Sequence, residues 1–246
     1  MTNDHTLPPL VLTGFLLALI FIAMEAFAGF GSRWGWWNFM IGIGMLRWAA
    51  YGGLCAAVVN AVGFAVSSFH HRVFASAALS IAGIIIGLSA AGIPWTWMQA
   101  AKQVPPIHDI TTDTTNPPEF KAILALRKNA PNSASYGGEE IAAEQRKAYP
   151  DIRPLVMPVS ARVAFEKALT VARRMGWEIV AMVPSEGRIE AVDSTFWFGF
   201  KDDIVIRILA EGEGSRVDIR SESRVGVSDI GTNAKRIRTF LEKMQS

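Results

Sequence analysis

The sequence predicts a membrane α-helical part with three spans, followed by a soluble α+β domain. Two observations predict this division. Half of the 246 residues are hydrophobic, and the charges gather toward the C-terminal end. Residues 1–101 contain only five formally charged side chains, whereas residues 151–246 contain 15 basic and 14 acidic ones. Long apolar stretches with so few charges are typical of membrane helices, and a balanced charge mixture is typical of a domain in water.

Three apolar stretches are long enough to cross a bilayer: residues 10–30, 46–67 and 73–98. A hydrocarbon core of about 30 Å takes roughly 20 helical residues. Each stretch must be helical, because in lipid only internal hydrogen bonds satisfy the backbone. Trp34, Trp36 and Trp37 follow the first stretch and suit the headgroup layer, with a quinone or pigment pocket as the alternative. We therefore expect residues 1–101 to form a three-helix transmembrane domain.

Glu25 and Asn60 are the polar side chains of interest within these stretches. A charge at the bilayer centre costs roughly 2.5–3.5 kcal/mol, so an acid there is a functional candidate. Glu25 lies near the end of its stretch and near Arg33, so we expect its side chain to reach the interface. Asn60 is expected to hydrogen-bond to a neighbouring helix. Gly83 and Gly87 lie one helical turn apart and predict close helix packing.

The rest of the chain predicts a linker and a folded domain. Residues 102–158 are rich in proline and predict an extended strap laid over the domain that follows, with short helical pieces at residues 118–127 and 139–148. Residues 159–246 predict a helix, a four-stranded antiparallel meander and a closing helix, because helical spacing gives way to alternation and then returns. The fold class is a two-layer α+β sandwich with one open sheet face.

Candidate ligand- or partner-binding residues lie in this domain: Trp197, Phe200, Arg207, Arg216, Arg220 and Arg224. The arginines fall at alternate strand positions, which places them on the outward face. Guanidinium groups bind carboxylates and phosphates bidentately, so a clamp for an anionic lipid headgroup is one interpretation. Cross-strand ion pairs on a solvated face are the alternative. The two aromatic residues predict either a partner surface or core packing.

The residues point to no catalytic site, no metal site and no cofactor. His108, Asp109 and Asp113 are closely spaced, but structural metal sites usually gather more ligands. Asp202 and Asp203 could share a proton, although a solvated turn is the alternative interpretation. Nucleic acid is not an expected partner, because the charge balance offers no basic surplus.

Four segments resemble the bacterial and plastid family catalogued as domain of unknown function 1499. They are RIEAVDSTFWFGFKDD at residues 188–203, SESRVGVSDIGTNAKRIR at 221–238, PIHDITTD at 106–113 and YPDIRPL at 149–155. The resemblance covers about residues 100–246 and implies no established activity. The simpler members of the family look exported or lipid-anchored, which implies a domain outside the cytoplasm. This chain departs from them by carrying three spans instead of a signal segment.

We therefore expect a multi-pass protein of the bacterial inner membrane with a periplasmic soluble domain. Arg33 and Arg47, against Arg72 in the second loop, instead favour a cytoplasmic domain by the positive-inside rule. The expected function is docking of a protein partner or an anionic lipid at the bilayer surface. The alternatives are an envelope enzyme that acts on a membrane-embedded substrate through Asp202, Asp203 or His108, and an accessory subunit of a membrane complex.

Overall fold

The computed structural model describes residues 8–68 and 73–246. The chain forms two compact units. One consists of Met1–Ala100 with Phe196–Gly199, and the other of Ala101–Thr195 with Phe200–Ser246. Arg72, in the second predicted loop, lies outside the described residues.

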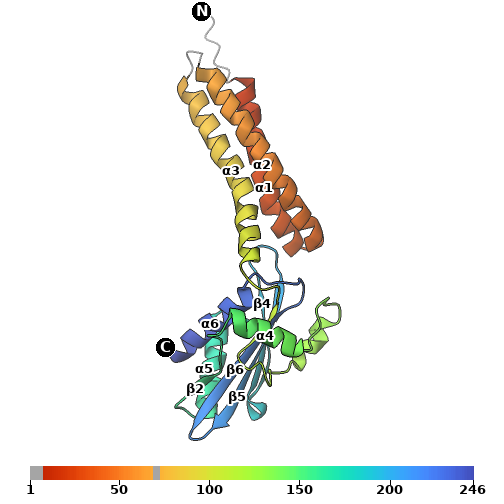
Figure 1. Ribbon diagram of the computed structural model, residues 1–246, viewed down its shortest axis with the longest axis vertical. Coiled ribbons are helices and arrows are strands. Elements are labelled where there is room, and N and C mark those ends of the chain that lie inside the picture. The colour runs from red at the N-terminus through yellow and green to blue at the C-terminus, as the bar shows by residue number, and fades with distance from the viewer. Residues whose placement is uncertain (1–7, 69–72) are drawn as a thin grey trace, which may run out of the picture. The chain divides into compact units, whose positions relative to one another are not determined.

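The first unit contains the three long apolar helices α1 (Pro9–Arg33), α2 (Phe39–Ser68) and α3 (Val73–Lys102), which lie side by side in Figure 1. Each is long and apolar enough, by length and composition, to cross a membrane. The three predicted spans are therefore confirmed as helices of that length and composition.

Small residues set the distances between these helices. A Cβ atom added to Gly53 of α2 would lie only 2.6 Å from the carbonyl oxygen of Gly87 in α3. A Cβ atom added to Gly14 of α1 would lie 2.9 Å from the Asn60 side chain. The helix backbones can approach this closely only because these positions carry no side chain.

The second unit is built around an antiparallel sheet with the strand order β1-β6-β5-β4-β3 and with β2 also paired to β6. In chain order its elements are β1 (Asp109–Thr111), η1 (Ala122–Arg127), α4 (Gly138–Ala148), β2 (Leu155–Met157), α5 (Ala161–Arg174), β3 (Glu178–Val183), η2 (Pro184–Glu186), β4 (Arg188–Ser194), β5 (Lys201–Glu211), β6 (Gly214–Ser223) and α6 (Thr232–Gln245). The predicted meander, β3 to β6, and its flanking helices are confirmed. Two short strands from the predicted linker widen the sheet, because both pair with the outer edge of β6.

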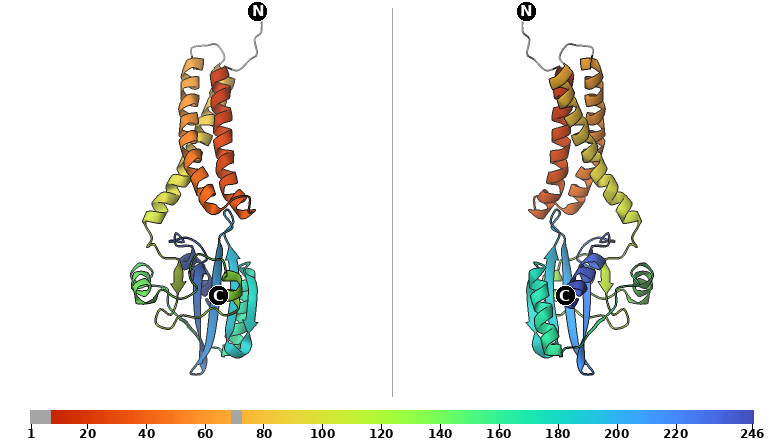
Figure 2. Two further views of the ribbon diagram at one scale, coloured as in Figure 1. Left: turned by 90° about the vertical axis from the view of Figure 1, so that its right-hand side faces the viewer. Right: turned by 90° about the vertical axis from the view of Figure 1, so that its left-hand side faces the viewer.

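The main core lies between the sheet and helices α5 and α6, which cover one of its faces (Figure 2). Ser160 caps α5, since its hydroxyl oxygen accepts a hydrogen bond from the Val163 amide at 3.4 Å. Trp177 stacks on Phe240 of α6 with ring centroids 5.6 Å apart. Alternate residues of β5, such as Ile204 and Ile206, point into this layer.

The other face of the sheet is covered, which corrects the expectation of an open face. Residues 112–137, called the cover below, pass over it and include η1. Phe120 and Ile123 of the cover pack against Val192 and Val205. The Glu190 carboxylate accepts hydrogen bonds from three successive cover amides, those of residues 121–123, at 2.9–3.1 Å. The predicted strap thus contains both apolar and polar anchors to the sheet.

Candidate functional site

The covered sheet face carries a row of charged side chains from β5 and β6. In β6, Val217 and Ile219 point toward the helices, so the residues between and beyond them point to the cover. This row comprises Arg216, Asp218, Arg220 and Glu222, and Asp203 and Arg207 join it from β5 through the strand pairing. The cover withdraws most of these groups from water, and Arg220 is only 2% exposed.

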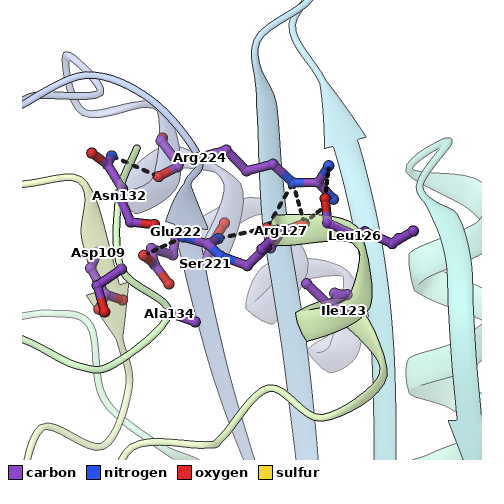
Figure 3. Close-up of polar contacts among 12 residues, drawn as sticks. Asp109, Ile123, Leu126, Arg127, Asn132, Ala134, Ser221, Glu222 and Arg224 are labelled. Carbon is purple, nitrogen blue, oxygen red and sulfur yellow. Dashed lines mark hydrogen bonds and ion pairs between the residues drawn. The ribbon is translucent and has the colours of Figure 1, made fainter. Parts of the chain in front are cut away.

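Arg127, from η1 in the cover, joins two strands of the sheet. Its Nη1 lies 2.6 Å from Asp203 Oδ2, and its Nη2 lies 2.8 Å from Glu222 Oε1. Figure 3 shows Arg127 and Glu222 meeting between the cover and the sheet. Both carboxylates are fully buried, so each depends on this guanidinium to offset its loss of hydration.

Two further arginines complete the centre of this ionic network. Arg220 forms a two-pronged pair with Asp109 of β1, at 2.9 and 2.8 Å, and stacks over the Phe120 ring at 4.7 Å. Arg224 holds Asp203 in the same way, with Nη2 to Oδ1 at 2.7 Å and Nε to Oδ2 at 2.9 Å. Three arginines therefore face three carboxyl groups, so each of these guanidinium groups has an acidic partner.

The remaining candidate arginines lie at the rim of the same face. Arg207 and Arg216 both contact Asp113 of the cover, at 3.1 and 2.8 Å, and both contact the buried Asp218. All four predicted arginines are thus brought together, but each is paired with a carboxylate of its own domain. An anionic headgroup would have to displace those pairs. The alternative interpretation of cross-strand ion pairs describes the geometry, except that the face is covered instead of solvated.

Within this network, the pKa of Glu222 is clearly shifted from its ordinary value. Burial raises its pKa from the ordinary value of 4.5 to about 8, because desolvation disfavours the charged form. Nearby Asp109 and Asp203 raise it further, while Arg127 and Arg220 oppose the rise. The network can therefore bind a proton near neutral pH.

Asp202 and Asp203 lie on opposite faces of β5, which corrects both earlier interpretations of this pair. Both are buried in the strand, so neither lies in a solvated turn. Asp202 pairs with Arg236 of α6 at 2.6 Å, and Arg236 also reaches Asp193 at 2.9 Å. Each aspartate therefore has its own arginine partners on its own face of the sheet.

The three closely spaced residues that were considered for a metal site, His108, Asp109 and Asp113, have separate partners. Asp109 and Asp113 bind arginines, whereas the His108 ring nitrogen Nδ1 lies 3.3 Å from the carbonyl oxygen of Val227. Among the residues that the structure describes, no group of three histidine, cysteine or acidic side chains is placed to hold a metal ion.

The aromatic candidates do not join the arginines. Trp197 belongs to the helical unit, where its indole N–H donates to the Ala26 carbonyl at 3.0 Å and its ring lies edge-on to Trp97 at 5.0 Å. Phe200 begins the return into the sheet, with its amide donating to the Thr195 hydroxyl at 2.9 Å.

The intramembrane candidates are both buried among the helices. Asn60 is fully buried, and its side-chain amide donates to the carbonyl of Ala56 in its own helix at 2.8 Å, which corrects the expectation of a hydrogen bond to a neighbouring helix. The Glu25 side chain is 3% exposed and lies buried within the helical unit. This corrects the expectation that its side chain reaches toward the interface.

Arg127 is not identified from the overall sequence pattern, because the proline-rich residues 102–158 predict a linker. A signal was present in the spacing of Phe120, Ile123 and Arg127, which recur at three- and four-residue intervals and so share one face of a helical segment. Asp109 and Glu190 were not singled out as partners, because nothing local marks a pair that is far apart in sequence.

The matched region of one known family coincides with this domain. Residues 109–244 match the family described as "Protein of unknown function (DUF1499)". The match begins at β1 and ends near the end of α6, so it includes the cover and the whole ionic network. No curated protein matches the chain.

Replacing Arg127 should unfold the domain more readily than replacing a lysine in the same cover. Arg127→Met leaves Asp203 and Glu222 with less compensation, and we expect it to lower the free energy of unfolding by about 3–5 kcal/mol. Lys121→Met breaks only an exposed pair with Glu186 and should cost far less, because water already screens that pair. Urea unfolding of the full chain in mild detergent measures both. Equal losses would show that Arg127 has no special role.

The stability of the domain should decrease as pH rises through about 8. Because the folded-state pKa of Glu222 lies above 4.5, the folded protein binds its proton more tightly than the unfolded chain does. That contribution is complete below pH 4.5 and is lost as pH rises through about 8. Urea unfolding between pH 6 and pH 9 (roughly the window in question) should show this slope in the natural protein and a flatter one in Glu222→Gln. Parallel slopes would exclude Glu222 as the source.

Proposed function

The chain belongs to the DUF1499 family, whose description names no activity, and we propose that it is a membrane-anchored module whose soluble domain docks onto the lipid headgroup layer. The docking element is the β6–α6 loop, residues 224–231. The observation that carries the proposal is an ordered loop that presents apolar side chains to solvent next to the segment that follows α3.

The loop exposes Val227 and Ile230, which are 74% and 40% exposed. It is held in place by its own polar groups, since Ser228 and Asp229 accept hydrogen bonds from the amides of residues 230 and 231 at 3.2 and 2.9 Å. Ile230 adopts a φ of +53°, which is uncommon for a β-branched residue. Strain of this kind is often retained where a side chain serves a binding role.

The loop is hydrogen-bonded to the chain segment that directly follows α3. The Asp229 amide donates to the Ile107 carbonyl at 3.4 Å, and the Ser228 hydroxyl donates to the Pro105 carbonyl at 3.4 Å. Pro105 follows Lys102, the last residue of α3, by three positions. Three extended residues span at most about 11 Å, so the reach of this segment is short.

Basic side chains flank the apolar ones. The exposed Lys201 accepts a hydrogen bond at its carbonyl from the Arg224 amide at 3.0 Å, and the exposed Lys235 lies in the first turn of α6. A lysine near an anionic bilayer surface contributes about 1 kcal/mol of attraction. Apolar residues between basic ones suit the boundary of headgroups and acyl chains, which favours an anionic lipid as the partner.

A fluorescent probe on the loop should report contact with lipid. We expect a Val227→Cys label, in a Cys55→Ser background, to be quenched by headgroup spin-labelled lipid in nanodiscs. A Glu213→Cys label should be quenched much less, because the β5–β6 turn lies at the other end of the sheet. Adding Lys201→Glu and Lys235→Glu should reduce quenching at Val227→Cys in anionic nanodiscs. Equal quenching at the two labelled positions would contradict lipid docking.

We propose further that the protein resides in the bacterial inner membrane with its domain in the periplasm. Three spanning helices place the chain on opposite sides of the bilayer before the first helix and after the third. The exported or anchored character of the simpler family members favours the outer side for the domain. The arginines of the first loop favour the opposite orientation, but they are few.

Labelling in intact cells should decide this orientation. A membrane-impermeant maleimide should modify Glu213→Cys, again without Cys55, in cells whose outer membrane has been permeabilised. A cytoplasmic protein with one exposed cysteine serves as the control and should react only after lysis. Reaction of Glu213→Cys only after lysis would place the domain in the cytoplasm.

A further inference from the structure

Four uncharged polar side chains lie buried between the membrane helices: Asn60 and Ser67 of α2, and Ser76 and Ser80 of α3. None is more than 3% exposed. Within the described residues, Asn60 Oδ1 and the three serine hydroxyls have no hydrogen-bond partner. The interface between α2 and α3, called the α2–α3 seam below, therefore contains four polar atoms that have no hydrogen-bond partner among the described residues.

The packing of the helices arranges these atoms in a line. The Asn60 amide lies against Gly83 of α3, and Gly53 lies against Gly87, so α2 and α3 run antiparallel. Ser67 follows Asn60 by seven residues and Ser76 precedes Gly83 by seven, which is two turns on each helix. Both serines thus lie about 10 Å from Asn60 along the seam. Ser80, one turn before Gly83, lies between these levels.

Leaving these atoms unsatisfied in an apolar bundle is costly. Each unmade hydrogen bond to a buried polar group costs about 1–3 kcal/mol, and lipid offers no bulk water in compensation. A serine on the same helix shows that the backbone can supply a partner, because the Ser89 hydroxyl donates to the Ile85 carbonyl at 2.8 Å. The inner serines do not make this bond, although their hydroxyl oxygens are buried.

We propose that the α2–α3 seam is a hydrated inlet, in which water molecules enter at the C-terminal end of α2 and stop at Asn60. The lining matches water, because the Asn60 oxygen accepts hydrogen bonds and each hydroxyl both donates and accepts. A buried water usually makes about three hydrogen bonds, which neighbouring pairs of these side chains and helix carbonyls can supply. The four side chains are uncharged, which favours a neutral ligand over an ion.

The inlet ends within the membrane unit. Beyond Asn60 the seam is closed by small residues, since a Cβ atom on Gly53 would come within 2.6 Å of the Gly87 carbonyl. Glu25 lies outside the line, because it follows Gly14 by eleven residues, or about 16 Å along α1. Water therefore reaches the middle of the bundle from one side only.

Thiol accessibility tests this inlet in the full chain. In a Cys55→Ser background in nanodiscs, Ser80→Cys should react with a small water-soluble methanethiosulfonate at least ten times faster than Ile81→Cys. Ile81 is the adjacent residue, lies at the same depth and is exposed on the outside of the bundle. Only a thiol in contact with water forms the reactive thiolate readily. The reaction rate of Ser76→Cys gives a second measurement, one helical turn from Ser80 along α3.

Three results would overturn the inlet. Ser80→Cys and Ser76→Cys could be as slow as Ile81→Cys, which would show a dry seam whose hydroxyls bond to their own helices. All three could react quickly, which would place this part of α3 in water. Ala90→Cys, buried on the far side of the Gly53–Gly87 contact, could react as quickly as Ser80→Cys, which would show that the water does not stop at Asn60. Elution of each variant as the natural protein does on gel filtration confirms that it is folded.

Discussion

The Arg127 guanidinium is the contact on which the soluble domain depends, because it joins the cover to the neighbouring strands β5 and β6. It lies between two fully buried carboxylates, and a buried charge is tolerated only when it is paired and hydrogen-bonded. Asp203 and Glu222 in turn hold Arg224 and Arg220. Because the three guanidinium groups and the three carboxyl groups depend on one another, no member can leave without exposing another. The cover is therefore part of the folded domain.

This internal pairing also decides which surface is free for recognition. The arginines that could bind an anion are already paired with carboxylates of the same domain. They therefore stabilise the fold of the domain. One of them positions the docking loop directly, since Arg224 begins that loop and is held by Asp203. Asn132 of the cover adds to this, donating to the carbonyls of Ser223 and Gly226, both at 2.9 Å. The covered network thus supports the apolar loop that we assign to the bilayer surface.

Much of the fold follows from local pattern, and the site does not. Hydrophobic length predicts the three helices, and alternation predicts β3 to β6. The cover escapes such reasoning, because its role depends on pairs such as Asp109 with Arg220, which are 111 positions apart. Glu25 shows a related limit. Its place near the end of a stretch suggests the interface, but the face of α1 on which it lies turns it inward.

Amide hydrogen exchange of the full chain tests most directly whether the cover is an integral part of the domain. The amides of Lys121, Ala122 and Ile123 all donate to Glu190 beneath the cover. We expect them to exchange as slowly as the amides of β5, because the cover can open only when the ionic network separates. Exchange at the rate of an unstructured peptide would contradict this, since the cover would then be a loose linker over an open sheet.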